Sequence, residues 1–201
     1  MKTYNIYIVL TRTNTVISKL IQIFKKDEYT HAAISLDKEL KHMYGFGRKR
    51  TYNPIIGGFK HENINKGAYR FCRRLPGIII ELEVSKKQYE KVKKLLNHFI
   101  SNSNNYKYNY KGLFYNVFNK EGYCGNRFLC SEFVYYILNE SGIVDFHKSR
   151  NLIRPQNLLH LEGNIVYKGD LKNMEYPCEF SEISYYSLRQ QDNAIASCRI
   201  Q

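Results

Sequence analysis

Two residues of the sequence have surroundings that suit covalent catalysis. Cys130 opens the helix-like run 129–138, LCSEFVYYIL, and His31 lies in the strand-like run 29–37, YTHAAISLD. Free backbone N–H groups and the dipole at a helix start favour a thiolate, and the same groups can receive an oxyanion. An imidazole held on a neighbouring strand can act as the general base. The pair therefore predicts acyl chemistry through a Cys130 thioester.

A structural role for the cysteine is the competing interpretation. Cys130 shares the predicted inward face of Phe133, Val134, Ile137 and Leu138. A cysteine on an apolar helix face is more often a buried packing residue than a nucleophile. Residue types alone leave both interpretations open.

A catalytic imidazole also needs a group that orients it, and the hairpin expected after His31 supplies one. If residues 38–39 form a two-residue loop, His31 faces Phe46, and Tyr44 becomes its diagonal neighbour on the same face of the sheet. A three-residue loop would reverse this parity and remove Tyr44 from the imidazole. The first register predicts a catalytic set of Cys130, His31 and Tyr44.

Two other polar residues compete with Tyr44 for the orienting role. His42 lies two residues from Tyr44 on the same expected strand, and Glu62 follows within the segment 47–67. That segment is rich in Gly, Asn, Lys and Arg, so it is expected to be an irregular surface excursion. A solvated His42, a core Tyr44 and a surface Glu62 are equally compatible with the sequence. The third residue stays open among the three.

The apolar pattern predicts one α+β domain over 1–201, with a core at about 4–170 and a polar, loosely held C-terminal tail. Strands are expected at 4–10, 30–36, 40–46, 69–72, 78–84 and about 164–168. Helices are expected after Asn14, at 86–101 behind a capping box that begins at Ser85, within 106–118, and from 129 to a stop at Gly142.

Charge and cysteine usage limit the partners and cofactors. The net charge of +13 favours acidic partners, but the basic residues are scattered, so no specific nucleic-acid site is predicted. Arg48 and Lys49 are the exception, because they follow the expected orienting strand and can meet an acidic substrate. The five cysteines are an odd number without a Cys-x-x-Cys pair, so reduced thiols are expected, with no metal and no cofactor.

The N-terminal run 1–11 indicates a first strand instead of a targeting signal. It carries one early lysine and a short apolar run, but no small-residue cleavage site. No apolar stretch of about 18 residues occurs. We therefore expect a cytoplasmic protein without a membrane span. Its oligomeric state is not indicated by the sequence.

Several segments together resemble a known superfamily. The segments are YTHAAISLD at 29–37, MYGFGRK at 43–49, GGFKHE at 57–62 and FLCSEFV at 128–134. In this order they resemble bacterial members of the circularly permuted papain-like (NlpC-type) cysteine hydrolase superfamily, which also contains lecithin:retinol acyltransferase-like enzymes. With 8–13 and 106–113, which look like the same bacterial subgroup, the resemblance spans about residues 6–160.

The resemblance implies a fold and a family of reactions. An antiparallel half-barrel sheet would pack on the cysteine helix, with Cys130 as nucleophile, His31 as base and a polar orienting residue, often a histidine, on the following strand. Permutation would explain why the cysteine follows the histidine, since catalytic geometry does not depend on chain order. The expected activity is hydrolysis or acyl transfer at an amide or peptide bond. The alternatives are a lipid acyltransferase or deacylase, and a non-catalytic binding module for an anionic polymer.

Overall fold

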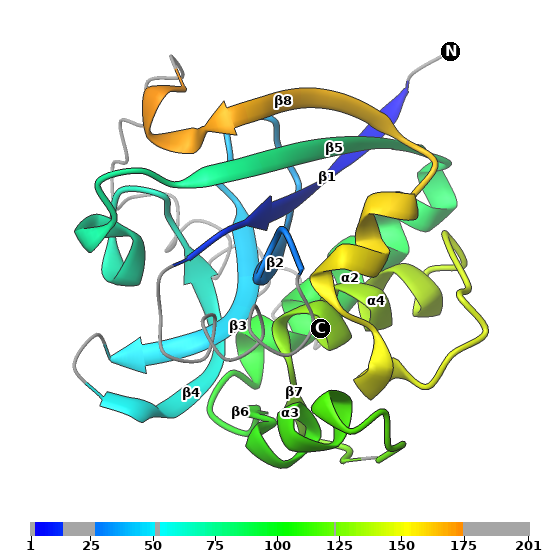
Figure 1. Ribbon diagram of the computed structural model, residues 1–201. Coiled ribbons are helices and arrows are strands. Elements are labelled where there is room, and N and C mark those ends of the chain that lie inside the picture. The colour runs from blue at the N-terminus through cyan, green and yellow to red at the C-terminus, as the bar shows by residue number, and fades with distance from the viewer. Residues whose placement is uncertain (1–2, 14–26, 51–52, 123, 175–201) are drawn as a thin grey trace, which may run out of the picture.

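The computed structural model describes residues 3–13, 27–50, 53–122 and 124–174 (Figure 1). The helix expected after Asn14 and the polar tail lie outside these ranges. No helix within them is long and apolar enough to cross a membrane.

One eight-stranded sheet organises the described part of the chain, in the order β7-β6-β4-β3-β2-β1-β5-β8. All neighbouring strands are antiparallel except β6 and β7. The strands are β1 Tyr4–Thr11, β2 His31–Ser35, β3 Met43–Arg50, β4 Asn53–Glu62, β5 Pro76–Val84, β6 Lys107–Tyr108, β7 Arg127–Phe128 and β8 Asn164–Asp170. The prediction of a mixed α+β fold with a mostly antiparallel sheet is confirmed.

The described helices begin and end at signals in the sequence. They are α2 Lys86–Ser101, α3 Tyr110–Val117 and α4 Cys130–Glu140, with the short 3-10 helices η1 Gly67–Phe71, η2 Arg150–Leu152, η3 Pro155–His160 and η4 Leu171–Asn173. The predicted capping box starts α2, since the Gln88 backbone N–H donates to Ser85 Oγ and the Gln88 side chain accepts from the Ser85 N–H. Past the end of α4, Gly142 adopts a positive φ of 67°, as expected for a helix stop.

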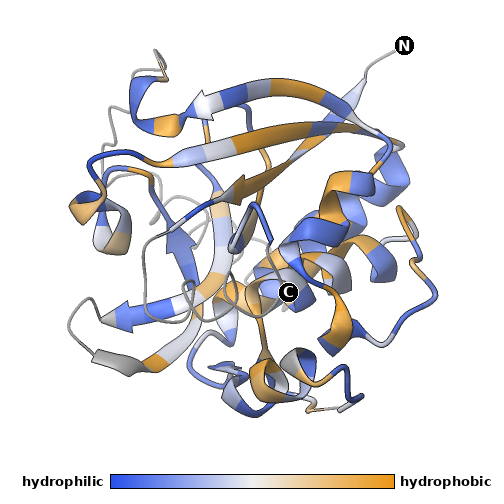
Figure 2. Cartoon of the chain, viewed as in Figure 1, coloured by the Kyte–Doolittle hydropathy of each residue, from blue (hydrophilic) through white to orange (hydrophobic). Residues whose placement is uncertain are grey.

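The sheet buries both of its faces. One face packs against α2 and α4 through residues such as Ile8, Phe46, Phe99 and Phe133. The other face carries Tyr7, Val9, Ala33, Met43 and Ile79, and it is covered by the segments that contain Tyr69, Leu75 and Leu171. Figure 2 shows hydrophobic residues running along β5, one of the strands between these layers. The two sets alternate along the central strands β1, β2, β3 and β5, as a sheet covered on both sides requires, whereas β8 at the edge is largely exposed.

The segment 47–67 is not the irregular excursion that its composition predicts. Strands β3 and β4 form a hairpin across most of it, with Gly47 paired to Gly58. The glycines of β4 allow another strand to approach: a Cβ atom on Gly58 would lie 2.5 Å from the Tyr106 carbonyl oxygen at the start of the β6 segment. Glycine serves here for close backbone packing, which local composition does not distinguish from a loop. The strand expected at 69–72 is likewise wrong, because this segment forms the end of η1.

The predicted register of β2 on β3 is wrong by one residue. Ala33 pairs with Gly45 and Ile34 with Tyr44, so His31 does not face Phe46. The connection is longer than two residues because Asp37 binds the backbone N–H groups of positions 41 and 42, at 2.7 and 2.8 Å. A slip of one residue moves every β3 side chain to the other face.

Candidate active site

The start of β2 and the start of α4 bring the predicted nucleophile and base together. His31 is the first residue of β2, and Cys130 is the first residue of α4, which packs against that strand. The two side chains lie close enough to interact, because Cys130 contributes, after Glu62, to the raised pKa of His31. The thiol is nearly buried, since Cys130 is 5% exposed.

A buried carboxylate holds the other side of the imidazole. His31 Nε2 lies 3.1 Å from Oε1 and 3.0 Å from Oε2 of Glu62, whose side chain is completely buried. An ionised carboxylate only accepts hydrogen bonds, so Nε2 is the donor and Nδ1 remains for Cys130. Glu62, which the sequence left open as an alternative, therefore occupies the position behind the imidazole.

The charges of His31 and Glu62 favour the ionised form of both side chains. Burial alone would lower the pKa of His31, but the charges of Glu62 and Cys130 raise it to about 10. Burial alone would raise the pKa of Glu62, but the charges of His31 and Lys60 lower it to about 2. The two groups form an imidazolium–carboxylate pair at neutral pH. A neighbouring imidazolium is a setting that favours a cysteine thiolate.

Three further residues shape the space around Glu62. Tyr69 donates a hydrogen bond from its buried phenol to Glu62 Oε2 at 2.7 Å, and Lys60 Nζ lies 3.8 Å from Oε1. A Cβ atom on Gly45 would lie 2.7 Å from the same Oε1, so the carboxylate needs glycine there. Sequence reasoning missed Tyr69, which no local pattern marks. The alternate glycines of the segment 43–49 were a readable signal, because they clear one face of a strand.

Tyr44, predicted as the orienting residue, does not reach the imidazole. The register places it opposite Ile34, on the face of the sheet away from His31. Its ring stacks on Phe59 at a centroid distance of 5.9 Å and meets His61 edge-on at 5.3 Å. The prediction failed because the longer β2–β3 connection reverses the parity on which it depended.

His42 has a role in the same connection. Its Nδ1 lies 2.8 Å from Asp37 Oδ2, and this hydrogen bond raises the pKa of His42. The backbone N–H of His42 donates to the same carboxylate oxygen. These contacts stabilise the turn, and they engage His42 away from the imidazole of His31.

A buried ionic network fixes the start of α4. Glu132, which is fully buried, accepts hydrogen bonds from the Leu129 backbone N–H at 3.0 Å, from Asn109 Nδ2 at 3.2 Å and from Arg150 Nε at 2.8 Å. A carboxylate in the first helical turn also interacts favourably with the helix dipole. These donors hold the turn from which Cys130 projects.

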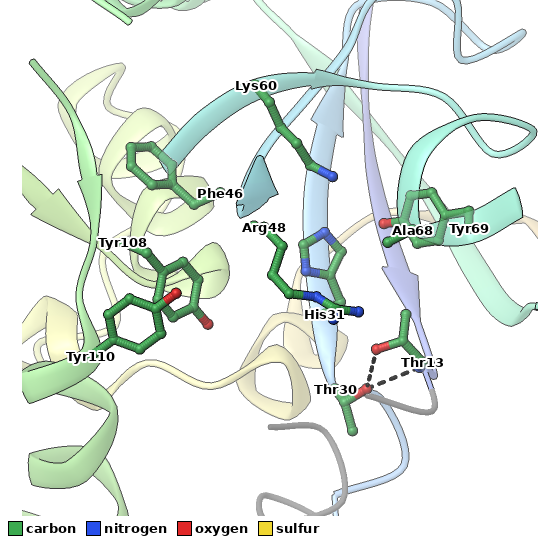
Figure 3. Close-up of a pocket in the computed structure, with 11 residues that line it drawn as sticks. Thr13, Thr30, His31, Phe46, Arg48, Lys60, Ala68, Tyr69, Tyr108 and Tyr110 are labelled. Carbon is green, nitrogen blue, oxygen red and sulfur yellow. Dashed lines mark hydrogen bonds between the residues drawn. The ribbon is translucent and has the colours of Figure 1, made fainter. Parts of the chain in front are cut away.

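A pocket opens beside His31 (Figure 3). Tyr108 and Tyr110 lie on one side of the imidazole, and Tyr69 lies on the other. Burial raises the pKa of Tyr108, and the charge of Cys130 adds to this effect. Among the residues that the structure describes, no group of three or more His, Cys, Asp or Glu side chains could hold a metal ion.

Comparisons of the chain with protein-family models, curated proteins and solved structures find no match. The functional conclusion rests on the geometry of the Cys130, His31 and Glu62 side chains.

Proposed function

We propose that the protein is a cysteine-dependent hydrolase or acyl transferase that acts on an amide or peptide bond through a Cys130 thioester. One observation carries the proposal: the buried Glu62 carboxylate holds the His31 imidazole at the start of β2, and α4, which begins at Cys130, packs against that strand. A nucleophile, a base and a third group that orients the base are the components of nucleophilic acyl chemistry.

Each residue has a defined task in the proposed reaction. The Cys130 thiolate attacks the substrate carbonyl, and the backbone N–H groups of the first turn of α4 stabilise the oxyanion. His31 then donates its proton to the departing amine, which leaves the acyl group on the sulfur. Water, or another acceptor deprotonated by His31, then attacks the thioester carbonyl, which releases the acyl group and restores the thiolate and the imidazolium. Glu62 keeps the imidazole oriented and stabilises its positive charge throughout.

The same geometry supports assignment to the permuted papain-like fold. The strand-borne base and acid precede the helix-borne thiol in the chain, which is the order that permutation would produce. The mostly antiparallel sheet that packs on α4 is consistent with the half-barrel that the resemblance implies.

Lipid acyl chemistry is the second candidate, and the surface of α3 favours it. Phe114 and Phe118 are 62% and 57% exposed, and their ring centroids lie 4.7 Å apart. Lys111 is exposed on the same helix, whose first residue, Tyr110, lines the pocket. Exposed aromatic rings beside a cationic side chain suit contact with a lipid interface.

The proposal is tested by labelling and by turnover. Iodoacetamide at neutral pH, followed by peptide mapping, should modify Cys130 faster than Cys72 or Cys124, although Cys130 is the most buried of the three. Turnover of a panel of fluorogenic peptide amides and a phospholipid ester should be abolished in Cys130→Ala and retained in the matched control Cys124→Ala. Both variants should keep the melting temperature of the parent within a few degrees.

Two results would refute the proposal. One is faster labelling of Cys72 or Cys124 than of Cys130. The other is undiminished turnover by a folded Cys130→Ala protein. Preferential release of fatty acid from the phospholipid ester would select the second candidate.

A further inference from the structure

Two cationic side chains line the pocket. Lys60 reaches in from β4, where its Nζ lies 3.8 Å from Glu62 Oε1 and 5.8 Å from the centroid of the Tyr69 ring. Arg48 reaches in from β3, and its charge lowers the pKa of Tyr110 against the stronger effect of burial. Figure 3 shows both side chains extending toward His31. A group bound in this pocket therefore lies near two positive charges.

The described lining of the pocket contains no carboxylate side chain. Glu62, the nearest one, is buried behind the imidazole, where it accepts hydrogen bonds from His31 and Tyr69. Its charge acts on His31, and it also offsets part of the charge of Lys60, whose Nζ lies 3.8 Å from Oε1. A substrate group near Lys60 and Arg48 is favoured there if it is an anion.

The positive lining continues beyond the catalytic pair. A second hollow shares Arg48 and Lys60 with the pocket and adds Lys49 and Lys66. Glu62 is the one acidic residue in the described lining of that hollow. An anionic substrate that approaches His31 would therefore meet cationic side chains in both hollows, and such surfaces also raise association rates.

We infer that the substrate carries a carboxylate beside its scissile carbonyl, bound near Lys60 and Arg48. The inference rests on the proposed function, because it concerns the same site. Amide substrates acquire such a group from an Asp or Glu side chain or from a chain terminus. The positive charges of Arg48 and Lys60 both favour a carboxylate over a neutral group.

Two small alkylating agents test this inference without any turnover. Iodoacetate carries a carboxylate and iodoacetamide is neutral, and both react with the same thiolate. The ratio of their rates at Cys130 therefore reports charge selection and cancels any change in thiolate fraction. Relative to the same ratio at Cys124, it should be about tenfold higher in the wild-type protein. Lys60→Gln and Arg48→Gln should each lower it severalfold, whereas Lys94→Gln, an equal charge change on the exposed side of α2, should not.

The outcomes separate this inference from the proposed function. A ratio at Cys130 equal to that at Cys124, or one insensitive to both pocket variants, overturns the carboxylate site even if neutral amides are hydrolysed. A high ratio that both variants lower supports the site even if no amide is turned over. Since the two variants alter different strands, a folding defect in one leaves the other as the test.

Discussion

The imidazole of His31 is held by charge as well as by orientation. A fully buried carboxylate is costly unless several donors satisfy it, and Glu62 has His31, Tyr69 and Lys60 around it. A neutral amide or phenol behind His31 would orient the ring without keeping it protonated. The buried carboxylate instead maintains an imidazolium beside Cys130, which is the electrostatic setting of a reactive thiol.

The ion pair predicts a pH dependence of stability that Glu62→Gln should remove. The pKa of His31 is raised to about 10, so above its ordinary value of 6.5 the folded state retains a proton that the unfolded state releases. The free energy of unfolding should therefore fall as pH rises from 7 toward 10, by at most ~1.4 kcal/mol per pH unit from this group. Urea unfolding of the wild-type protein and of Glu62→Gln across this pH range measures the difference.

At low pH, the stability should change with pH in the opposite direction. The pKa of Glu62 is lowered to about 2, so its stabilisation is present above its ordinary value of 4.5 and is lost as pH falls toward 2. Glu62→Gln should therefore flatten the stability profile on both flanks. Parallel profiles for the two proteins between pH 7 and 9 would contradict the ion pair.

At the scale of residues, the sequence pointed to Cys130 and His31, which begin the packed elements α4 and β2, but left the choice of Glu62 open. The first two lie at element starts, which local patterns reveal. The third depends on the parity of a hairpin, and that parity depends on a turn in which Leu40 adopts a positive φ of 57°. A non-glycine residue in the left-handed region is uncommon, so nothing local predicted this turn.

Among the elements, β3 positions Glu62 because two of its residues on the face toward that carboxylate have no side chain. Gly45 and Gly47 lie on its face toward Glu62, where Cβ atoms would lie 2.7 and 3.8 Å from Oε1. The carboxylate occupies the volume that a side chain at position 45 would need. Strand β3 thus acts as the floor of the site, although it contributes no catalytic group there.

Gly45→Ala should displace the Glu62 carboxylate while leaving the sheet in place. The added methyl group must move Oε1 because 2.7 Å is too short for a carbon–oxygen contact. We expect Cys130 labelling and turnover to fall on the order of tenfold, since small displacements of a catalytic group reduce rate strongly. Overpacking should also cost about 1–3 kcal/mol of stability, measured by urea unfolding.

Gly169→Ala on β8 is the matched control for a glycine in a strand. Its added Cβ atom would meet the Tyr167 hydroxyl at 3.3 Å, far from the catalytic pair in the sheet order. This variant should keep wild-type labelling. Equal labelling of Cys130 in the two variants would show that Gly45 does not set the position of the acid.

The helices and most strands were predictable because their signals are local. Apolar periodicity, the Ser85 capping box and the stop at Gly142 each lie within a few residues of the element they define. The β3–β4 hairpin was not predictable, because its glycines are explained only by the approach of residues 106–108. Close packing between segments distant in the chain leaves no mark in a local pattern.

Across the whole molecule, chain order and spatial order differ at the site. Base and acid come from β2 and β4, and the thiol comes from α4, which follows them by a long stretch of chain. Neither the sheet order nor the contact between α4 and β2 follows from local periodicity. The net charge of +13 belongs to the whole chain, and the pocket lining is also cationic. Both can attract an anionic substrate.

Added salt distinguishes the effect of the overall net charge from the effect of the two pocket cations, Lys60 and Arg48. The screening length is ~8 Å at 0.15 M ionic strength and ~3 Å at 1 M, so distant charges cease to act while partly buried contacts persist. The iodoacetate-to-iodoacetamide ratio at Cys130 should therefore fall with added salt to a plateau that stays severalfold above the ratio at Cys124. In the double variant Lys60→Gln, Arg48→Gln, the ratio at 1 M salt should reach that of Cys124. If the wild-type ratio also reaches it, overall charge accounts for the preference, because a carboxylate held near the two pocket cations would resist this screening.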